Sequence, residues 1–373
     1  MAFVQHQKIS FNSSDGAFNE TSALDVVGNF TTPTSTKTWT VAAVFSLLTC
    51  ISGIIANGTL LFLFARDSAL RTPFNIYLIN LLLADFICVA IGYPMDLISN
   101  LNNLQWLLGN SICNLYLYNL STVQAAIFHC HLLIAVNRIW AVLHPLSYRS
   151  VHSVRIAVLT CLGMWVYVNL AAGPELILDA LFYRAAVETN GCYFNTVALH
   201  TYDTVAQLLF FHFPHLVMLI ALAIVTRAKW KKHRARRIRN NVVVPSGLRR
   251  LPLSNVNGPS SNHTSADRTA GSQRPIASLR PNPKRESHGY RLLVLLTVSV
   301  TVCWTPIDIY FTLAGQLNNF DMPIFYQVSA VLFSFQTTMD PIIFTLAVKT
   351  LREALRNLFR FNCHAAHENQ PCN

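Results

Sequence analysis

The chain has 373 residues, of which 52% are hydrophobic and only 12% are charged, and its formal net charge is +11. Soluble domains carry about 25% charged residues, so this composition argues against an ordinary soluble protein. Seven apolar stretches are each long enough to cross a bilayer core, which takes roughly 20 residues. Buried core helices of a large soluble protein are the alternative, but they would rarely give seven such runs.

The apolar stretches predict an all-α membrane protein, a seven-transmembrane helix bundle over residues 40–348. The expected spans are residues 40–65, 74–98, 112–137, 154–178, 204–226, 291–315 and 324–348. The fifth span is the least regular, because His212, Pro214 and His215 lie in its middle. Residues 1–39 form a tail before the bundle, and residues 349–373 form a tail after it.

Basic residues fix the expected orientation. Of the 28 Lys and Arg residues, three, namely Lys8, Lys37 and Arg184, fall in the N-terminal tail or the second, fourth and sixth connections, which leaves 28 − 3 = 25 for the other side. Basic connections stay in the cytoplasm, so we expect an extracellular N-terminus and a cytoplasmic C-terminus. The positive net charge is therefore a topology signal, and no nucleic-acid partner is predicted.

The expected outer face carries modification signals. Three glycosylation sequons begin at Asn12, Asn19 and Asn29 in the tail. Cys113 and Cys192 are the only pair of cysteines at this face, where an oxidising compartment permits bonding. We therefore predict a Cys113–Cys192 disulfide.

Two basic segments follow the fifth and seventh spans. Residues 227–289 begin with a basic, helix-compatible run and continue as a Ser-, Pro- and Gly-rich segment that is expected to be disordered. Residues 349–361 predict a basic amphipathic helix on the membrane surface, with Cys363 as a palmitoylation candidate. Membrane lipids are expected contacts of both segments.

Each span also carries one short motif. In chain order these are Asn57, Leu81-Leu-Leu-Ala84-Asp85, Trp106-x-x-Gly109-x-x-x-Cys113 with Arg138, Trp165, Pro214, Cys303-Trp304-Thr305-Pro306 and Asp340-Pro341-Ile-Ile-Phe344. In this order they resemble the rhodopsin-like (class A) family of G-protein-coupled receptors over residues 40–361. The resemblance implies a plasma-membrane receptor, not an enzyme, whose partners are an extracellular ligand and a heterotrimeric G protein.

The resemblance assigns Arg138 to G-protein coupling. It implies that Arg138 pairs with Glu286 in the resting state, and that breaking this latch opens a cleft for the G protein. Pro145 and Tyr148 then lie in the inner loop that contacts the G protein. Asn137 replaces the family's acidic residue, which removes one restraint on Arg138. An arginine that merely reaches the membrane interface is the alternative.

Activation is expected to depend on proline kinks and one large aromatic side chain. Pro214, Pro306 and Pro341 interrupt the backbone ladder of their helices. Trp304, two residues before Pro306, is expected to sense a ligand and bias the kink, although a packed core aromatic is the alternative. Phe344 replaces the family's inner tyrosine, and this departure opposes the effect of Asn137.

Polar residues between the spans form an expected polar core. Asp85 and Asp340 need partners or an ion inside the membrane, and with Asn57, Gln336 and Thr337 they could enclose water and a sodium ion. Ile127 stands where the family has a serine, which argues against sodium. His131, two turns before Arg138, stands where the family has an aliphatic residue.

The implied ligand pocket lies between the outer halves of the spans. Its expected lining residues are Asp96, Tyr116, Leu120, Ser121, Gln124, Asp308, Phe311 and Ser334. Leu120 stands where amine receptors have an aspartate, and Ser334 where opsins have the retinal-binding lysine, so neither ligand is expected. Asp308 and Asp96 instead predict a cationic ligand such as a peptide, with hydrogen bonds inside the bundle as the alternative.

Other functions remain open from sequence. A transporter or channel is disfavoured, because the chain has neither internal repeats nor a polar file through the spans. A seven-span binding or decoy protein without G-protein signalling is compatible with the altered motifs at residues 137–139 and 340–344. No catalytic group and no metal site other than sodium is expected.

Overall fold

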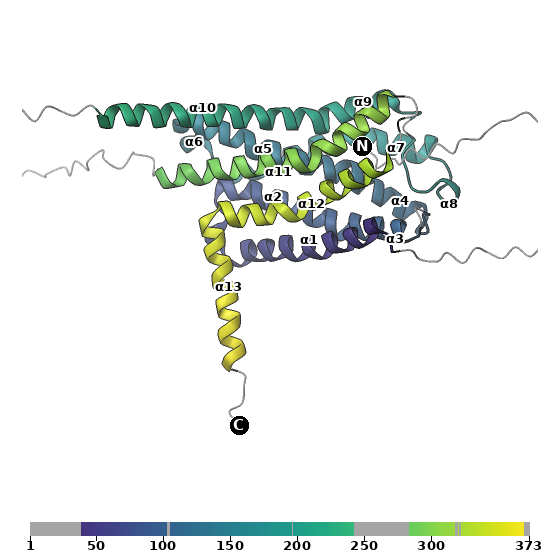
Figure 1. The fold of residues 1–373 in the computed structure, drawn as a ribbon, viewed down its shortest axis with the longest axis horizontal. Helices are drawn as coiled ribbons and strands as arrows, with labels where there is room; N and C mark the ends of the chain where they lie inside the picture. The colour runs from purple at the N-terminus through teal and green to yellow at the C-terminus, as the bar shows by residue number, and fades with distance from the viewer. Residues whose placement is uncertain are drawn as a thin grey trace, which may run out of the picture.

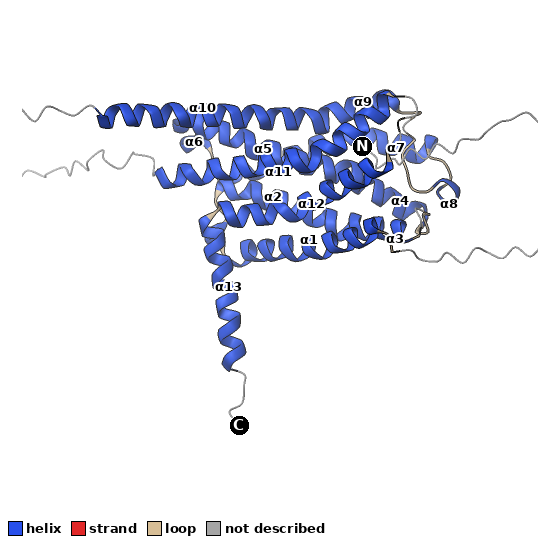
Figure 2. Cartoon of the chain, in the orientation of Figure 1, coloured by secondary structure: helices blue, strands red, loops and turns tan. Residues whose placement is uncertain are grey.

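The computed structural model describes residues 39–102, 105–195, 197–241, 283–317, 320 and 322–368. Within these residues the chain consists of helices and connecting turns, without a strand (Figure 2). Seven helical stretches among them are long and apolar enough to cross a membrane: Ala43–Arg66, Pro73–Leu101, Gly109–Leu143, Val154–Tyr183, His200–Ala235, Gly289–Ala314 and Pro323–Ala347. The predicted all-α seven-span bundle is confirmed.

The first span is α1 (Val41–Arg66). A short 3-10 turn (Ser68–Leu70) connects it to the second span, which contains α2 (Pro73–Ile87) and α3 (Tyr93–Leu101). The third and fourth spans are α4 (Gly109–Tyr118) with α5 (Gln124–Leu143), and α7 (Val154–Leu178), with α6 (Pro145–Val151) between them. After α8 (Val187–Asn190) come α9 (His200–Gln207) and α10 (Phe213–Asn241), then α11 (Pro283–Gln316), α12 (Pro323–Ala347) and α13 (Lys349–Glu368).

Four spans contain a widened π-turn that the apolar pattern did not predict: Cys88–Gly92, Asn119–Val123, Asp179–Tyr183 and Leu208–His212. Two of these turns are explained by proline. Pro94 and Pro214 cannot donate to the carbonyl four residues earlier and their rings clash with it. Those carbonyls belong to residues 90 and 210, inside the first and last of the π-turns, where the wider backbone makes room.

The helices run side by side, and α13 turns away across one end of the bundle (Figure 1). Some contacts join helices that follow one another in the chain, and others join helices far apart in sequence. α1 packs on α12, α2 on α5 and α7, and α11 on α10 and α12. We call the end with α6 and α13 the arginine end, because Arg138 lies near it. The opposite end, with α8 and the Cys113–Cys192 bond, is the disulfide end.

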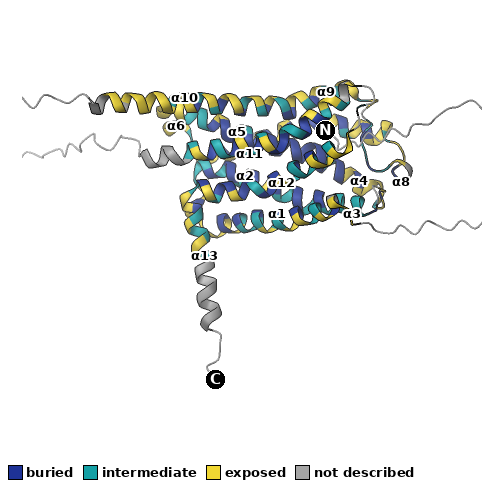
Figure 3. Ribbon diagram, viewed as in Figure 1, coloured by how far each residue is buried: buried dark blue, intermediate teal, exposed yellow. Residues whose placement is uncertain are grey.

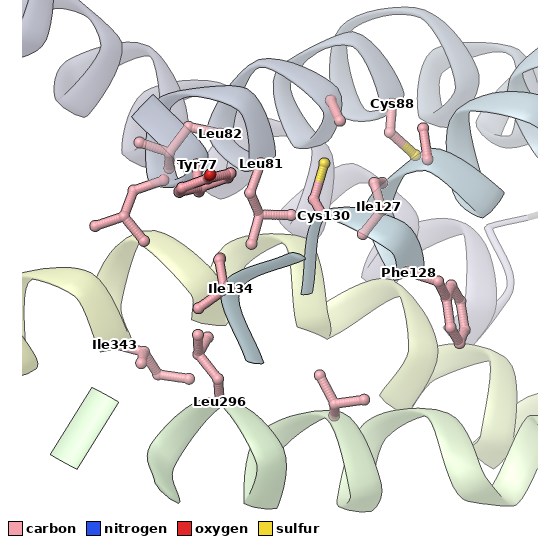
Figure 4. Packing of buried hydrophobic residues seen from close by; sticks show 14 of the residues in the cluster. Tyr77, Leu81, Leu82, Cys88, Ile127, Phe128, Cys130, Ile134, Leu296 and Ile343 are labelled. Atoms are coloured by element: carbon pink, nitrogen blue, oxygen red, sulfur yellow. The ribbon is translucent and has the colours of Figure 1, made fainter. Parts of the chain in front are cut away.

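Buried residues lie where the helices meet in the centre of the bundle (Figure 3), and most of them are apolar. Figure 4 shows Ile134 of α5 close to Leu296 of α11 and Ile343 of α12, with Leu81 of α2 on its other side. Large apolar side chains also cover the outside, for example Leu159 and Leu170, which are 66% and 72% exposed. A lipid-facing surface of this kind costs nothing in a bilayer, whereas it would be costly in water.

The segments after the fifth and seventh spans contain more helix than a loop. Segment 227–289 begins as the end of α10, in agreement with its helix-compatible start, and it ends as the start of α11, while residues 242–282 lie outside the described residues. Likewise α13 runs to Glu368, beyond residue 361. Asn12, Asn19 and Asn29 lie outside the described residues, and so does the side chain of Cys363, so these modifications stay predictions.

Candidate functional site

Arg138 does not end its helix as the sequence suggested. The helix α5 continues to Leu143 and stops at His144, whose φ of −125° and ψ of 63° are not helical. His144 precedes Pro145, and a proline disfavours the helical conformation of the residue before it. Arg138 therefore lies more than a turn inside α5, where its side chain can reach neighbouring helices.

The guanidinium of Arg138 lies between α2 and α11. Its Cζ is 3.2 Å from the centroid of the Phe74 ring at the start of α2. On the other side, a Cβ placed on Gly289 of α11 would come within 2.7 Å of the Arg138 Nη1. Glu286 lies one turn before Gly289 in α11, but its side chain is outside the described part of the chain, so the Arg138–Glu286 latch stays a prediction.

Asn137 binds the connection between α5 and α7. The Tyr148 hydroxyl donates to its Oδ1 at 3.1 Å, and its Nδ2 lies 3.1 Å from Nε2 of His152. The His152 ring stacks on Tyr148, with ring centroids 4.4 Å apart. Burial, and then the positive charge of Arg138, lower the pKa of His152, which favours the neutral ring that can accept from the Asn137 amide. Asn137 is therefore engaged by this connection.

His131 joins α5 to α12 in the centre of the bundle. Its Nε2 lies 3.1 Å from Oδ2 of Asp340, and both side chains are fully buried. Its Nδ1 is 2.9 Å from the Ile127 carbonyl oxygen, which can only accept, so Nδ1 carries a hydrogen. Gln336 Nε2 donates to the other Asp340 oxygen at 2.7 Å. The imidazole and the carboxyl therefore lie within ion-pair distance, and neither Nε2 nor Oδ2 has a hydrogen-bond partner among the described residues.

His131→Leu is expected to destabilise the receptor, because Asp340 keeps its burial but loses its partner on α5. Removing one member of a buried pair costs about 3–5 kcal/mol. The midpoint of thermal unfolding of the purified protein should then fall by about 6 °C or more. A thermal-shift assay in detergent or nanodiscs measures this.

The double variant His131→Leu/Asp340→Leu is the control, since an apolar pair of similar volume can replace a buried polar pair at little cost. It should recover much of the lost stability. A loss equal to the sum of the two single effects would show that these side chains are not coupled, and would refute the link.

Asp85 and Asn57 present oxygens to the same polar core. Both carboxylate oxygens of Asp85 and Oδ1 of Asn57 are buried without a hydrogen-bond partner in the described residues. Asn57 Nδ2 donates to the Thr337 carbonyl at 2.9 Å, and the Thr337 hydroxyl donates to the Ser334 carbonyl at 3.0 Å. Oxygen atoms are the ligands of hard cations. Asp85 and Asn57 are thus the members of the expected polar core that fit sodium best.

Trp304 lies in the middle of this region and is 1% exposed. Its ring stacks on Phe128 of α5, with centroids 3.4 Å apart, and meets the His131 ring edge-on at 5.1 Å. Pro306 and Pro341 lie inside α11 and α12, and Phe344 is fully buried. Trp304 therefore contacts the histidine that joins α5 to α12, two residues before the α11 proline.

The predicted disulfide between Cys113 and Cys192 is confirmed. A second attachment lies beside it, where Arg184 binds Asp179 with an Nη2–Oδ2 distance of 2.6 Å. Arg184 also donates to the Asn114 side chain, next to Cys113. Two links therefore hold the connection after α7 against the start of the third span.

The two carboxylates of the expected pocket differ in their contacts. Asp96 accepts hydrogen bonds from Ser46, Asn100 and Tyr116 at 3.2, 3.0 and 3.2 Å. Asp308 is 7% exposed, and its Oδ1 is buried without a hydrogen-bond partner in the described residues. Asp96 thus fits the alternative of bonds inside the bundle, whereas Asp308 has bonding capacity to spare.

The other expected pocket residues are placed as follows. Leu120, Ser121 and Gln124 are buried on the third span, while Phe311 and Ser334 are half-buried on α11 and α12. The hydroxyls of Ser121 and Ser334 donate to carbonyls of their own helices, those of Leu117 and Ala330, both at 2.9 Å. Gln124 Nε2 lies 3.2 Å from the Cys88 sulfur. These polar groups therefore already have hydrogen-bond partners inside the bundle.

Sequence reasoning missed several contact residues of these sites. Phe74, Gly289 and His152 carry no motif of their own, and they become significant only through their distance to Arg138 or Asn137. Arg184 did carry a signal, since it is the only basic residue in the connections expected outside. A basic residue there without a topological role suggests a specific acidic partner, which is Asp179.

Comparison with known proteins agrees with this geometry. Residues 56–344 match the family described as 7 transmembrane receptor (rhodopsin family). The Substance-K receptor of Mesocricetus auratus is 24% identical, over 86% of this chain and 75% of that receptor. The Neuromedin-U receptor 1 of Rattus norvegicus is 25% identical, over 91% of this chain and 78% of its own length. Melanopsin of Felis catus is 33% identical over 32% of this chain and 25% of melanopsin.

Proposed function

Because the chain belongs to the rhodopsin family of seven-transmembrane receptors, we propose that it couples an extracellular ligand to a heterotrimeric G protein. It is a multi-pass membrane receptor rather than an enzyme. In the proposed orientation, the disulfide end faces outwards and the arginine end faces the cytoplasm, in agreement with the basic connections. The observation that supports coupling most strongly is the contact of Arg138 with both α2 and α11.

The proposed mechanism is a shift between two populations. In the closed form, the inner ends of α5 and α11 are held together around Arg138. A ligand at the disulfide end favours the open form only if it binds that form better. Trp304 can transmit the difference, because it touches His131 on α5 and lies two residues before Pro306 of α11. In the resting form, Asp85 and Asn57 are the residues that would hold a sodium ion, whose role would be to neutralise the buried carboxylate.

The proposed ligand carries a cationic group, and a peptide is the preferred class. Asp308 supplies the reason, since a buried carboxylate oxygen without a partner is costly until a cation or donor reaches it. Two of the similar proteins are named as receptors for substance K and for neuromedin U. Ser334 provides no amine for a Schiff base, so retinal is not proposed despite the likeness to melanopsin.

Asp308→Asn is expected to weaken responses to cationic ligands about 10- to 100-fold, since a hydrogen bond to a charged group contributes about 1.5–3 kcal/mol. The probe is a library of short peptides with Arg or Lys, each paired with a citrulline or norleucine counterpart. Asp96→Asn is the matched control. It should lower surface expression, because Asp96 serves three bonds inside the bundle, but it should keep the preference for basic peptides. An Asp308→Asn receptor with that preference unchanged would refute the anchor.

G-protein coupling is tested in cells with activation sensors for each main G-protein class. Wild type and Glu286→Ala are compared at matched surface levels, without ligand and with the peptide library. We expect at least one class to respond, and Glu286→Ala to exceed wild type without ligand because its latch is removed. If both proteins are silent in every class while peptides still bind, the chain is a binding protein without signalling and the proposal fails.

A further inference from the structure

We infer that Phe74 and Gly289 are the positioning residues that hold Arg138 in the closed form, as an aromatic face on one side and a bare backbone on the other. The inference rests on the proposed function only in calling this form closed. The contacts themselves follow from the geometry of three helices: Arg138 extends from α5, Phe74 from α2, and Gly289 lies in α11.

The neighbour of Arg138 in sequence does not hold it by charge. Asn137 is neutral, its amide group is engaged with Tyr148 and His152, and it lies on a buried part of α5. Neither Asn137 nor its partner Tyr148 carries a negative charge that would attract the guanidinium, and the positive charge of Arg138 lowers the pKa of His152. The contacts of Arg138 with α2 and α11 are therefore the ones to consider.

Phe74 offers the guanidinium a negative ring face. At 3.2 Å from the ring centroid, the Arg138 Cζ lies well within the roughly 6 Å range of cation–π contacts. A planar, weakly hydrated guanidinium suits such stacking better than an ammonium group does. The ring is also firmly placed. Thr72 caps α2 by accepting from the Asn75 backbone N–H at 3.3 Å, and Asn75 Nδ2 donates to the Leu70 carbonyl at 2.7 Å.

Gly289 lets the guanidinium approach the backbone of α11. A Cβ at this position would lie 2.7 Å from Nη1, 3.1 Å from Cζ and 3.4 Å from Nε of Arg138. Glycine inside a helix costs about 1 kcal/mol relative to alanine, so alanine should favour the helix itself. Because the atoms it would meet end a flexible side chain, the arginine would move and the helix would stay folded. An alanine at residue 289 is thus expected to change the position of Arg138 without destabilising α11.

The test compares Gly289→Ala and Phe74→Leu with two matched controls. Gly163→Ala changes a glycine of α7 that has no atom within 4 Å of an added Cβ. Phe74→Tyr keeps the aromatic face. Ligand-independent G-protein activation is measured at equal surface levels. It should rise about 2- to 5-fold in Gly289→Ala and Phe74→Leu, as expected for loss of one exposed or half-buried cation–π contact, and stay at the wild-type value in both controls.

A second readout does not depend on coupling. Spin labels at the exposed positions Ser150 of α6 and Arg291 of α11 report the distance between these helices in purified, unliganded receptor. Cys50, Cys88, Cys130, Cys161 and Cys303 are free and buried. Cys363 and Cys372 are replaced by serine, so that the introduced cysteines carry the labels. Longer distances in Gly289→Ala and Phe74→Leu without any G-protein signal would support the positioning role while the proposed coupling fails. Wild-type distances in both variants, or a Phe74→Tyr receptor that behaves like Phe74→Leu, would overturn the inference.

Discussion

Arg138→Ala is expected to abolish G-protein activation, with or without ligand, while the receptor still reaches the cell surface. In the closed form its guanidinium touches α2 and α11 at the end that we propose faces the cytoplasm. In the proposed open form, those helices separate and the same cation is the group that the incoming G-protein segment meets. Alanine removes the charge and every donor of the guanidinium. We therefore expect a loss of at least about tenfold, which corresponds to about 1.4 kcal/mol.

Arg138→Lys is the matched variant, because it keeps the charge but loses the planar, multiply donating group. Activation should be partly retained. The measurement is sensor activation in the G-protein class to which the wild type responds, at matched surface levels and in the Glu286→Ala background as well. If Arg138→Ala signalled as strongly as wild type, the proposed role of this arginine would be wrong.

Removing the Cys113–Cys192 disulfide is expected to prevent the receptor from reaching the surface in functional form. The bond closes a loop with a sequence separation of 79 residues. In the chain-entropy account, a cross-link over such a loop stabilises by about 4.5 kcal/mol. That is a large fraction of the stability of a typical folded domain, about 5–15 kcal/mol. Surface labelling and thermal unfolding of Cys113→Ser and Cys192→Ser measure the effect.

Cys161→Ala is the control for this pair, since Cys161 is a buried free cysteine of α7. It should stay near the wild-type surface level. The Arg184–Asp179 attachment holds the same connection, so Arg184→Gln should lower stability further in the Cys113→Ser background. Wild-type surface expression and ligand response of the two serine variants would contradict a structural role for the bond.

The bundle could be predicted from sequence because membrane spans obey a length rule. All seven spans were found, and Cys113 and Cys192 were paired, since topology left no other cysteines at that face. The π-turns were not predicted. An apolar pattern records how hydrophobic a span is, whereas the extra residue in two of the four π-turns depends on where Pro94 and Pro214 remove a donor.

The sites were predicted less completely, because many of their contact residues are far apart in the sequence. Arg138 and Asp340 carry recognisable motifs, so they were singled out, but their partners Phe74, Gly289 and His131 could be identified only once the helices were placed side by side. Asp96 and Asp308 looked alike in sequence. Their difference depends on Ser46, Asn100 and Tyr116, which come from separate segments and meet at Asp96 alone.

The central claim, that the arginine end opens to admit a G protein, is tested most directly by the distance between labels at Ser150 and Arg291. The labelled receptor in nanodiscs is measured alone, with a nucleotide-free heterotrimer of the responding class, and after addition of a non-hydrolysable GTP analogue. The account predicts a longer distance in the complex that returns to the original value when the nucleotide releases the G protein. An unchanged distance in a complex that demonstrably forms would contradict it.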